Sequence, residues 1–225
     1  MSGENQAVTS ISDLFLADRL NAALPQTQCT RCSFPDCAAY AQAIASGEAA
    51  INQCPPGGVE GIARLAAITG LPALPLNLLH GSEGPRAVAV IDEAWCIGCT
   101  LCLDACPTDA IFGSHKQMHT VIEPWCTGCE LCLPACPVDC ISLENVSDER
   151  TGWAAWSADA AKTARKRYEI HSERGSKNLS NSIKTPEKLA FDALPAPATD
   201  LLADQKRAVI QAAMARARAQ RAAKD

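Results

Sequence analysis

The sequence is poor in aromatic residues and has no long hydrophobic run. Aromatic residues make up 4% of its 225 residues, so ordinary side-chain packing would give only a thin core. The longest apolar stretch, residues 65–79, is interrupted by Gly70, Pro72 and Pro75 and is shorter than the roughly twenty residues that span a bilayer. No signal or transit peptide is recognisable at the start. We therefore expect a soluble, cytoplasmic protein that is cross-linked by something other than a large core.

Cysteine, by contrast, is abundant, with thirteen residues. Eight of them form two runs of C-x₂-C-x₂-C-x₃-C-P, and the second run repeats the first thirty residues later. This is the bacterial run of iron–sulfur ligands, in which the fourth cysteine ligates the other cluster. The crossed pattern assigns one [4Fe–4S] cluster to Cys96, Cys99, Cys102 and Cys136, and another to Cys126, Cys129, Cys132 and Cys106.

Zinc sites and disulfides are the alternatives to clusters in this repeat. Structural zinc is typically held by paired C-x₂-C knuckles, which do not require a third close cysteine and a fourth followed by proline. Disulfides are typical of small secreted domains, and the chain has no secretion signal. The pattern therefore favours iron–sulfur clusters.

A further group of cysteines precedes the repeat. Its spacing is x₂, then x₄, then sixteen residues before a fourth cysteine followed by proline. This order is the reverse of the plant-type two-iron run, so spacing alone leaves the number of irons open and zinc as the alternative. We assign the group to a third [4Fe–4S] cluster, with the ligands Cys29, Cys32, Cys37 and Cys54. The remaining Cys140 is expected to be a small, buried apolar side chain.

The pattern of elements predicts an α+β fold. We expect a small helical iron–sulfur module, a bacterial-type two-cluster ferredoxin domain with pseudo-symmetric βαβ halves, and a basic helical C-terminal tail. The expected boundaries are an N-terminal helix in residues 1–25, a single-cluster module in 26–70, a linker in 71–85, the ferredoxin domain in 86–145, and a partly disordered tail in 146–225. Clusters can stabilise such a fold because metal binding and folding are coupled.

Individual elements follow from periodicity and capping signals. Helices are predicted over residues 11–24, 36–47, 58–69 and about 199–223, with helical turns at 100–106 and 130–136. Strands are predicted just after Arg86 and at 110–113, 118–123 and 141–144. The first helix should pack on its own domain through an apolar stripe of Ile11, Leu14, Phe15, Leu20 and Leu24.

Some aromatic and imidazole side chains close to the clusters are candidates for a functional role. Trp95 and Trp125 precede the first cysteine of each run, and we interpret them as packing residues at equivalent positions of a duplicated unit. His115 and His119 fall in the connection between the halves, and we interpret them as surface loop residues without a function.

The net charge of −5 conceals a segregation of charge along the chain. Residues 86–145 carry eight acids and two bases, whereas residues 146–225 carry ten acids and fifteen bases. Each oxidised four-iron cluster with four thiolates would add about −2 to the ferredoxin segment. We expect the basic tail to dock electrostatically, on the acidic domain or on an acidic partner, and the clusters to survive its removal.

Around the first cysteine group the sequence resembles a known family. The text of residues 24–58, joined to the double run, resembles the B subunit of the Rnf/Rsx electron transport complex, and so do M-H-T-V-I at 118–122 and C-P-V-D-C-I at 136–141. The resemblance covers about residues 11–145, and the first module also resembles the iron–sulfur domain of corrinoid proteins. Two departures stand out. The family usually begins with a membrane-spanning helix, and its first motif is Gly-rich where this chain has Thr30, Ser33 and Asp36.

The resemblance implies a membrane-bound complex that moves electrons between a nicotinamide nucleotide and ferredoxin, coupled to ion transport. From the residues we expect an electron carrier that passes single electrons through three [4Fe–4S] clusters, since no nucleophile, acid–base pair or nucleotide loop is recognisable. Its expected partners are a redox protein and membrane subunits of such a complex, which would hold it on the cytoplasmic face of the inner membrane. No small-molecule site, nucleic acid or direct membrane insertion is expected.

Two other functions remain open at this point. A free-standing soluble polyferredoxin, donating to a cytoplasmic partner, is favoured by the lack of a membrane anchor. A nucleic-acid-associated iron–sulfur protein is suggested by the basic tail, although its bases are not interleaved with aromatic residues.

Overall fold

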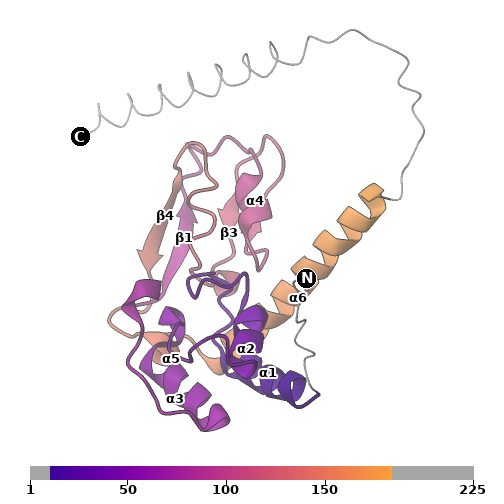
Figure 1. The fold of residues 1–225 in the computed structure, drawn as a ribbon. Coiled ribbons are helices and arrows are strands. Elements are labelled where there is room, and N and C mark those ends of the chain that lie inside the picture. Colours follow the sequence, from indigo (N-terminus) through magenta and orange to yellow (C-terminus); the bar gives the residue numbers. More distant parts are fainter. Residues whose placement is uncertain (1–10, 184–225) are drawn as a thin grey trace.

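The computed structural model describes residues 11–183. The first half of this range forms a helical module with three helices, α1 (Ile11–Ala23), α2 (Cys37–Ala45) and α3 (Gly58–Thr69). A short 3₁₀ turn, η1 (Pro55–Gly57), leads into α3. Figure 1 shows the helical module below the strands of the second half. The helices expected over residues 11–24, 36–47 and 58–69 are confirmed within two residues at each end.

The core of the helical module is small and built around one tyrosine. Tyr40 is 1% exposed, and its hydroxyl donates to the Ala50 carbonyl at 2.7 Å and accepts from the Gln53 amide at 3.1 Å. Leu20, Leu24, Ile51 and Leu65 belong to the same core. The stripe expected on α1 faces this core only in part, because Leu14 and Phe15 are 54% and 69% exposed.

The second half has the strands expected of a ferredoxin domain, in short form. They are β1 (Ala87–Ile91), β2 (Ile111–Phe112), β3 (Thr120–Val121) and β4 (Ile141–Asn145). The short helix α4 (Leu101–Ala105) lies in the first half of the repeat, and residues 131–135 form only turns at the equivalent place. A 3₁₀ turn, η3 (Glu123–Trp125), follows β3.

The strand pairing differs from a βαβ arrangement, in which the two strands of one unit are parallel. β1 pairs antiparallel with β4, and β2 pairs antiparallel with β3. Each half runs strand, Cys loop and strand, but both described pairings join one half to the other. The assigned ligation also joins the two halves, because the fourth cysteine of each run is assigned to the cluster of the other half.

The backbone of the two halves repeats as the sequence does. Positions thirty residues apart share a left-handed conformation, with φ between 49° and 69°. These pairs are Gly98 and Gly128, Thr100 and Glu130, and Asp109 and Asp139. The duplicated sequence therefore has a duplicated local geometry around the cysteines.

Residues 71–85 are irregular, as expected of a linker, apart from the 3₁₀ turn η2 (Leu78–His80). They are nonetheless attached to their neighbours. The Asn77 amide donates to the Asn52 carbonyl at 2.9 Å, and Glu83 accepts from the Val59 amide at 3.0 Å and from the Thr151 hydroxyl at 2.7 Å. The segment thus connects the helical module to the part of the chain that follows β4.

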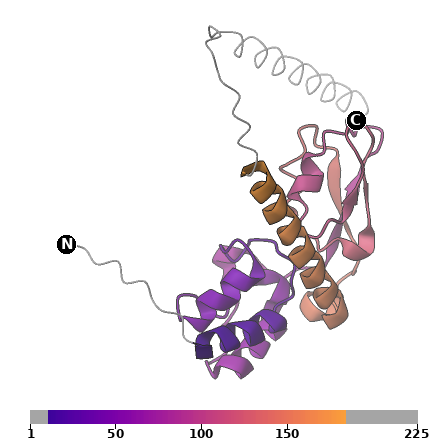
Figure 2. The ribbon, with the colours of Figure 1, turned by 90° about the vertical axis from the view of Figure 1, so that its right-hand side faces the viewer.

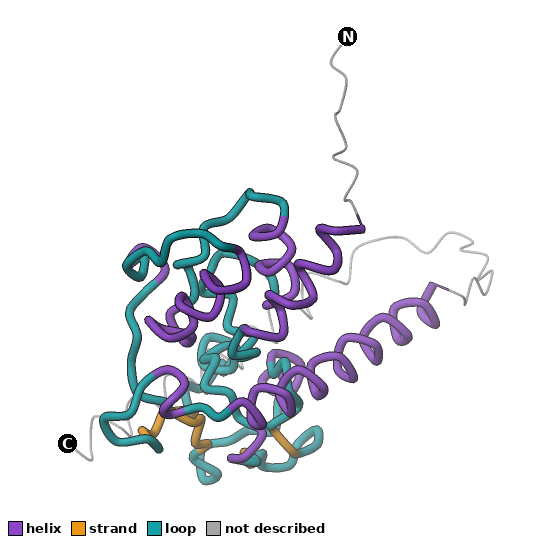
Figure 3. The backbone as a smooth tube through the Cα atoms, turned by 90° about the horizontal axis from the view of Figure 1, so that it is seen from below, coloured by secondary structure: helices purple, strands orange, loops and turns teal. Residues whose placement is uncertain are grey.

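The segment after β4 is not the separate tail expected from its charge. It contains α5 (Gly152–Ala155) and α6 (Ala158–Ile183). Trp156 is 7% exposed and its indole N–H donates to the Pro25 carbonyl at 2.8 Å. Figures 2 and 3 show α6 running alongside both halves of the molecule. Burial of Trp156 makes this segment part of the fold, while the helix predicted at 199–223 lies outside the described residues.

Candidate metal centres

Three separate cavities hold the twelve assigned cysteines, four to each cavity. The first cavity is lined by Cys29, Cys32, Cys37 and Cys54, the second by Cys96, Cys99, Cys102 and Cys136, and the third by Cys106, Cys126, Cys129 and Cys132. This is the grouping that the spacing predicts. The fold brings Cys106 and Cys136 each to the cavity of the opposite run.

Each cavity presents four assigned thiols to one shared space. Within residues 11–183, no three His, Cys, Asp or Glu side chains converge closely enough to hold one metal ion. Four soft thiols around one space, without three of them converging on a single point, fit an iron–sulfur cluster better than a tetrahedral zinc ion.

Burial makes these thiols reluctant to ionise on their own. It raises the pKa of Cys37 and Cys132 to about 12 and that of Cys102 to about 11, and nearby thiols add to the effect. Burial also raises the pKa of Cys54 well above its ordinary value. Because a thiolate is the ligand form, the metal must supply the positive charge that stabilises it.

Backbone amides point at several of the sulfur atoms. The Ala110 amide donates to Cys106 Sγ at 3.2 Å, and the Cys140 amide donates to Cys136 Sγ at 3.4 Å. These are equivalent contacts in the two halves, because each donor follows its cysteine by four residues. Hydrogen bonds to cluster sulfurs stabilise their negative charge, so the same turns that place the ligands also tune them.

The loop of the first cavity holds two residues in a left-handed backbone conformation. Thr30 and Ser33 have φ of 58° and 70°, a region that glycine adopts more easily. Asp36 instead has extended backbone and caps α2, accepting from the Ala39 amide at 2.7 Å. Gln28 closes the loop by accepting from the Cys37 amide at 2.9 Å. The loop thus reaches a shape that lines the cavity, with Thr30 and Ser33 in a left-handed conformation.

At the second cavity, one residue differs from its sequence interpretation and another has an unexpected neighbour. His119 is not a surface residue but is 1% exposed, and its Nδ1 lies 3.3 Å from Cys102 Sγ. The hairpin between β2 and β3 folds its side chain inward, which the local sequence does not indicate. Cys140 is buried as expected, at 5% exposure, but its sulfur also lies 3.5 Å from Cys136 Sγ and lines the cavity.

The helical module meets the ferredoxin half beside the third cavity. The Thr127 hydroxyl donates to the Thr27 carbonyl at 2.9 Å in a buried contact. Next to it, Arg31 and Glu130 form an ion pair at 2.5 Å. Both contacts join the loop that carries Cys29 to the loop that carries Cys129. The lining of the second cavity includes no residue of the helical module.

Comparison with known proteins agrees with this geometry. Residues 89–143 match a family described as a 4Fe-4S dicluster domain, and residues 24–56 match one described as a putative Fe-S cluster. The chain is 62% identical over 138 residues to the B subunit of the ion-translocating oxidoreductase complex of Azoarcus sp., an alignment that covers 61% of this chain and 75% of the relative. The chain belongs to the family of these B subunits.

Other relatives in this family carry the same name. The protein from Alkalilimnicola ehrlichii is 54% identical over 153 residues, which cover 67% of this chain and 81% of the relative. The one from Thiobacillus denitrificans is 60% identical over 107 residues, which cover 48% of this chain and 57% of the relative. No solved structure matches the chain. Among the described helices of this family member, none is both long and apolar enough to cross a membrane.

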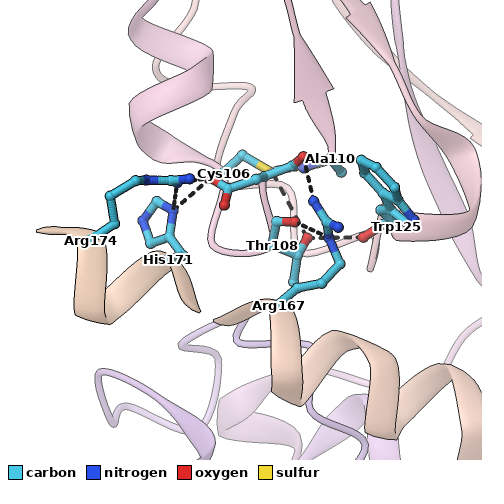
Figure 4. Close-up of polar contacts among 8 residues, drawn as sticks. Cys106, Thr108, Ala110, Trp125, Arg167, His171 and Arg174 are labelled. Carbon is cyan, nitrogen blue, oxygen red and sulfur yellow. Dashed lines mark hydrogen bonds and ion pairs between the residues drawn. The ribbon is translucent and has the colours of Figure 1, made fainter. Parts of the chain in front are cut away.

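In this member of the B-subunit family, α6 is fastened to the turn that follows Cys106 (Figure 4). Arg167 donates to the Thr108 carbonyl at 2.6 Å and to the Asp109 carbonyl at 3.0 Å, and its guanidinium lies 3.5 Å from the centre of the Trp125 ring. The Thr108 hydroxyl donates to the Trp125 carbonyl at 2.9 Å. Trp125 thus packs as expected, although its cationic partner comes from beyond the ferredoxin domain.

The carboxylate of Asp109 adds an ionic contact to the same turn. His171 Nδ1 lies 2.8 Å and Arg174 lies 2.6 Å from its Oδ1. Burial alone would raise the pKa of Asp109, but these hydrogen bonds and charges outweigh it and lower the pKa below its ordinary value. Part of the basic charge of the C-terminal segment is therefore used within the molecule.

Proposed function

We propose that this chain is an electron carrier with three [4Fe–4S] clusters, acting as the B subunit of an ion-translocating oxidoreductase complex. The observation that carries the proposal is the grouping of twelve cysteines, four by four, around three cavities in one folded body. Each cluster, when bound, supplies one-electron oxidation and reduction. The protein's own part is to hold the thiolates, shield them from water and stabilise their charge with amide hydrogen bonds.

The contacts between modules support an order for the three centres. The Thr127–Thr27 hydrogen bond and the Arg31–Glu130 ion pair set the first cavity beside the third. The exchange of Cys106 and Cys136 sets the third beside the second. We propose that the third cavity is the middle of a row and that electrons pass between the other two through it.

The partners that we propose are the other subunits of such a complex, which would hold the chain at the membrane. The acidic ferredoxin half, with eight acids and two bases in residues 86–145, would favour encounter with a basic surface. Dependence of the electron-transfer rate on salt would follow from such steering.

Anaerobic iron and sulfide analysis tests the number of clusters. We expect about twelve irons and about twelve sulfides per chain, since each cluster contains four of each. Three single variants each remove one ligand from one cavity: Cys32→Ala, Cys99→Ala and Cys129→Ala. Each should lower the iron content by about four atoms per chain. Tightly bound zinc with little sulfide would contradict the proposal.

Magnetic interaction between reduced clusters tests the order. In the electron paramagnetic resonance spectrum of the fully reduced protein, neighbouring clusters broaden one another's signals. We expect Cys129→Ala, which removes the middle centre, to leave two signals without mutual broadening. Cys99→Ala, which removes an end centre, should leave the remaining pair still interacting. Persistent interaction in Cys129→Ala would show that the row is wrong even if the iron content is right.

A further inference from the structure

We propose that His119 raises the reduction potential of the cluster in the second cavity by donating a hydrogen bond from Nδ1 to the sulfur of Cys102. The proposal rests on the proposed function, because it requires a cluster in that cavity. It begins from the distance of 3.3 Å between His119 Nδ1 and Cys102 Sγ. At 1% exposure, the ring has no access to solvent as an alternative partner.

The hairpin between β2 and β3 holds the ring in this position. Nε2 lies 3.3 Å from the Ser114 carbonyl oxygen. A carbonyl oxygen can only accept, as can an iron-bound sulfur, so both contacts are made together by a ring that carries a proton on each nitrogen. A Cβ atom on Gly113 would collide with the ring carbon Cδ2, which shows that the ring packs directly on the glycine backbone. The Lys116 amide donates to the Gly98 carbonyl at 2.9 Å and ties the hairpin to the ligand loop.

The chemistry of the pair gives the contact its direction. A sulfur bound to iron has lost its proton and can only accept a hydrogen bond, while an imidazole can carry a proton on Nδ1. Reduction adds one negative charge to the cluster, part of which resides on the ligand sulfurs. A donor aimed at such a sulfur therefore stabilises the reduced form more than the oxidised form, and the potential rises.

The effect should be confined to one of the three clusters. Cys132 is the equivalent of Cys102 in the other half, yet no histidine lines the third cavity among the described residues. No histidine lines the first cavity either within that part of the chain. His119 would thus give two centres built on a duplicated sequence different potentials, which sets a direction for electron flow between them.

Redox titration of the full chain, prepared anaerobically and followed by electron paramagnetic resonance at one fixed pH, tests the proposal. His119→Leu keeps most of the side-chain volume but removes the donor, and His119→Asn keeps an N–H near the position of Nδ1. We expect His119→Leu to lower one midpoint potential of three, the one that is missing in Cys99→Ala. His119→Asn should stay nearer the unsubstituted protein. Gly113→Ala, which displaces the ring without changing it, should lower the same midpoint.

His115→Leu is the matched control, because His115 is exposed in the same hairpin, and it should change no midpoint. The proposal is overturned if His119→Leu leaves all midpoints unchanged or moves all three together. It is also overturned if both His119→Leu and His119→Asn lose the second cluster, since His119 would then build the site instead of tuning it. Each of these results is distinct from a failure of the proposed function, which would show as too little iron in the unsubstituted chain.

Discussion

At the scale of single residues, Cys136 and Cys140 are the two candidates for the fourth ligand in the second cavity. The two sulfurs lie 3.5 Å apart and both line the cavity. Only Cys136 completes the C-x₂-C-x₂-C-x₃-C-P spacing, and its sulfur accepts the amide hydrogen bond of the turn. Burial and the neighbouring Cys136 raise the pKa of Cys140, which favours its neutral thiol.

We therefore predict that Cys140→Ala retains all three clusters. The expected content is about twelve irons, as in the unsubstituted chain, because no assigned ligand is lost. The double variant Cys136→Ala/Cys140→Ala should lose about four irons, since neither thiol is left to close the site. Anaerobic iron and sulfide analysis of both proteins provides the measurement. A loss of iron from Cys140→Ala alone would show that the ligand assignment is wrong.

At the scale of elements, α6 connects the two parts of the molecule. Its Tyr168 hydroxyl donates to the Asp36 carboxylate at 3.0 Å, at the cap of α2, while Arg167 contacts the turn after Cys106. The helix also packs Ala161 and Ala164 against Trp156, and such tertiary contacts supply most of a helix's stability in a folded protein. Arg167 combines two hydrogen bonds with a stacked aromatic ring, which makes it a principal anchor of the helix.

We predict that Arg167→Ala weakens the attachment of α6 to the ferredoxin half. Loss of the stacking and of two charged hydrogen bonds should cost about 2–4 kcal/mol, because two carbonyl groups lose their donor. The apparent melting temperature of the anaerobic protein should fall, and amide hydrogen exchange in α6 should accelerate. Lys166→Ala is the control, since Lys166 is exposed on the same helix and its removal should change little. Equal effects of the two substitutions would contradict the role given to Arg167.

At the scale of the whole molecule, the segment that follows β4 belongs to the folded body. Trp156 inserts between the modules, where its indole bonds to Pro25 and the Arg86 guanidinium lies 4.9 Å from the centre of its ring. Arg86 in turn donates to the Cys126 carbonyl at 2.8 Å, on the ligand loop of the third cavity. The segment thus supports that ligand loop through Arg86.

We predict that a chain ending at Asn145 loses clusters or melts at a lower temperature. Loss of one buried tryptophan alone costs about 3–5 kcal/mol, and the contacts of α6 are lost as well. A chain ending at Ile183 should retain about twelve irons, because all assigned ligands and described contacts remain. Iron content and the apparent melting temperature of the two truncated proteins decide the matter. If the shorter chain keeps its full iron content and melting temperature, the segment is a dispensable tail after all.

Much of this protein follows from the sequence alone, because metal ligation depends on residue type and spacing. The two runs predict which four cysteines share each cavity, including the exchange of Cys106 and Cys136. Helix α3 appears with the predicted bounds because Gly58 and Gly70 delimit its apolar pattern. Such signals are local, so they can be read without knowledge of the fold.

Other features were decided only by the tertiary structure, because they join residues far apart in the chain. His119 lies beside Cys102 because the hairpin turns its side chain inward. Arg167 reaches Trp125, and Trp156 reaches Pro25, across the boundary at which composition predicts a separate, partly disordered tail. A charge excess indicates exposure only on average, and a few long-range contacts with good geometry override it. The physical reason is that burial and cation–ring stacking depend on which surfaces meet, and spacing along the chain does not specify that.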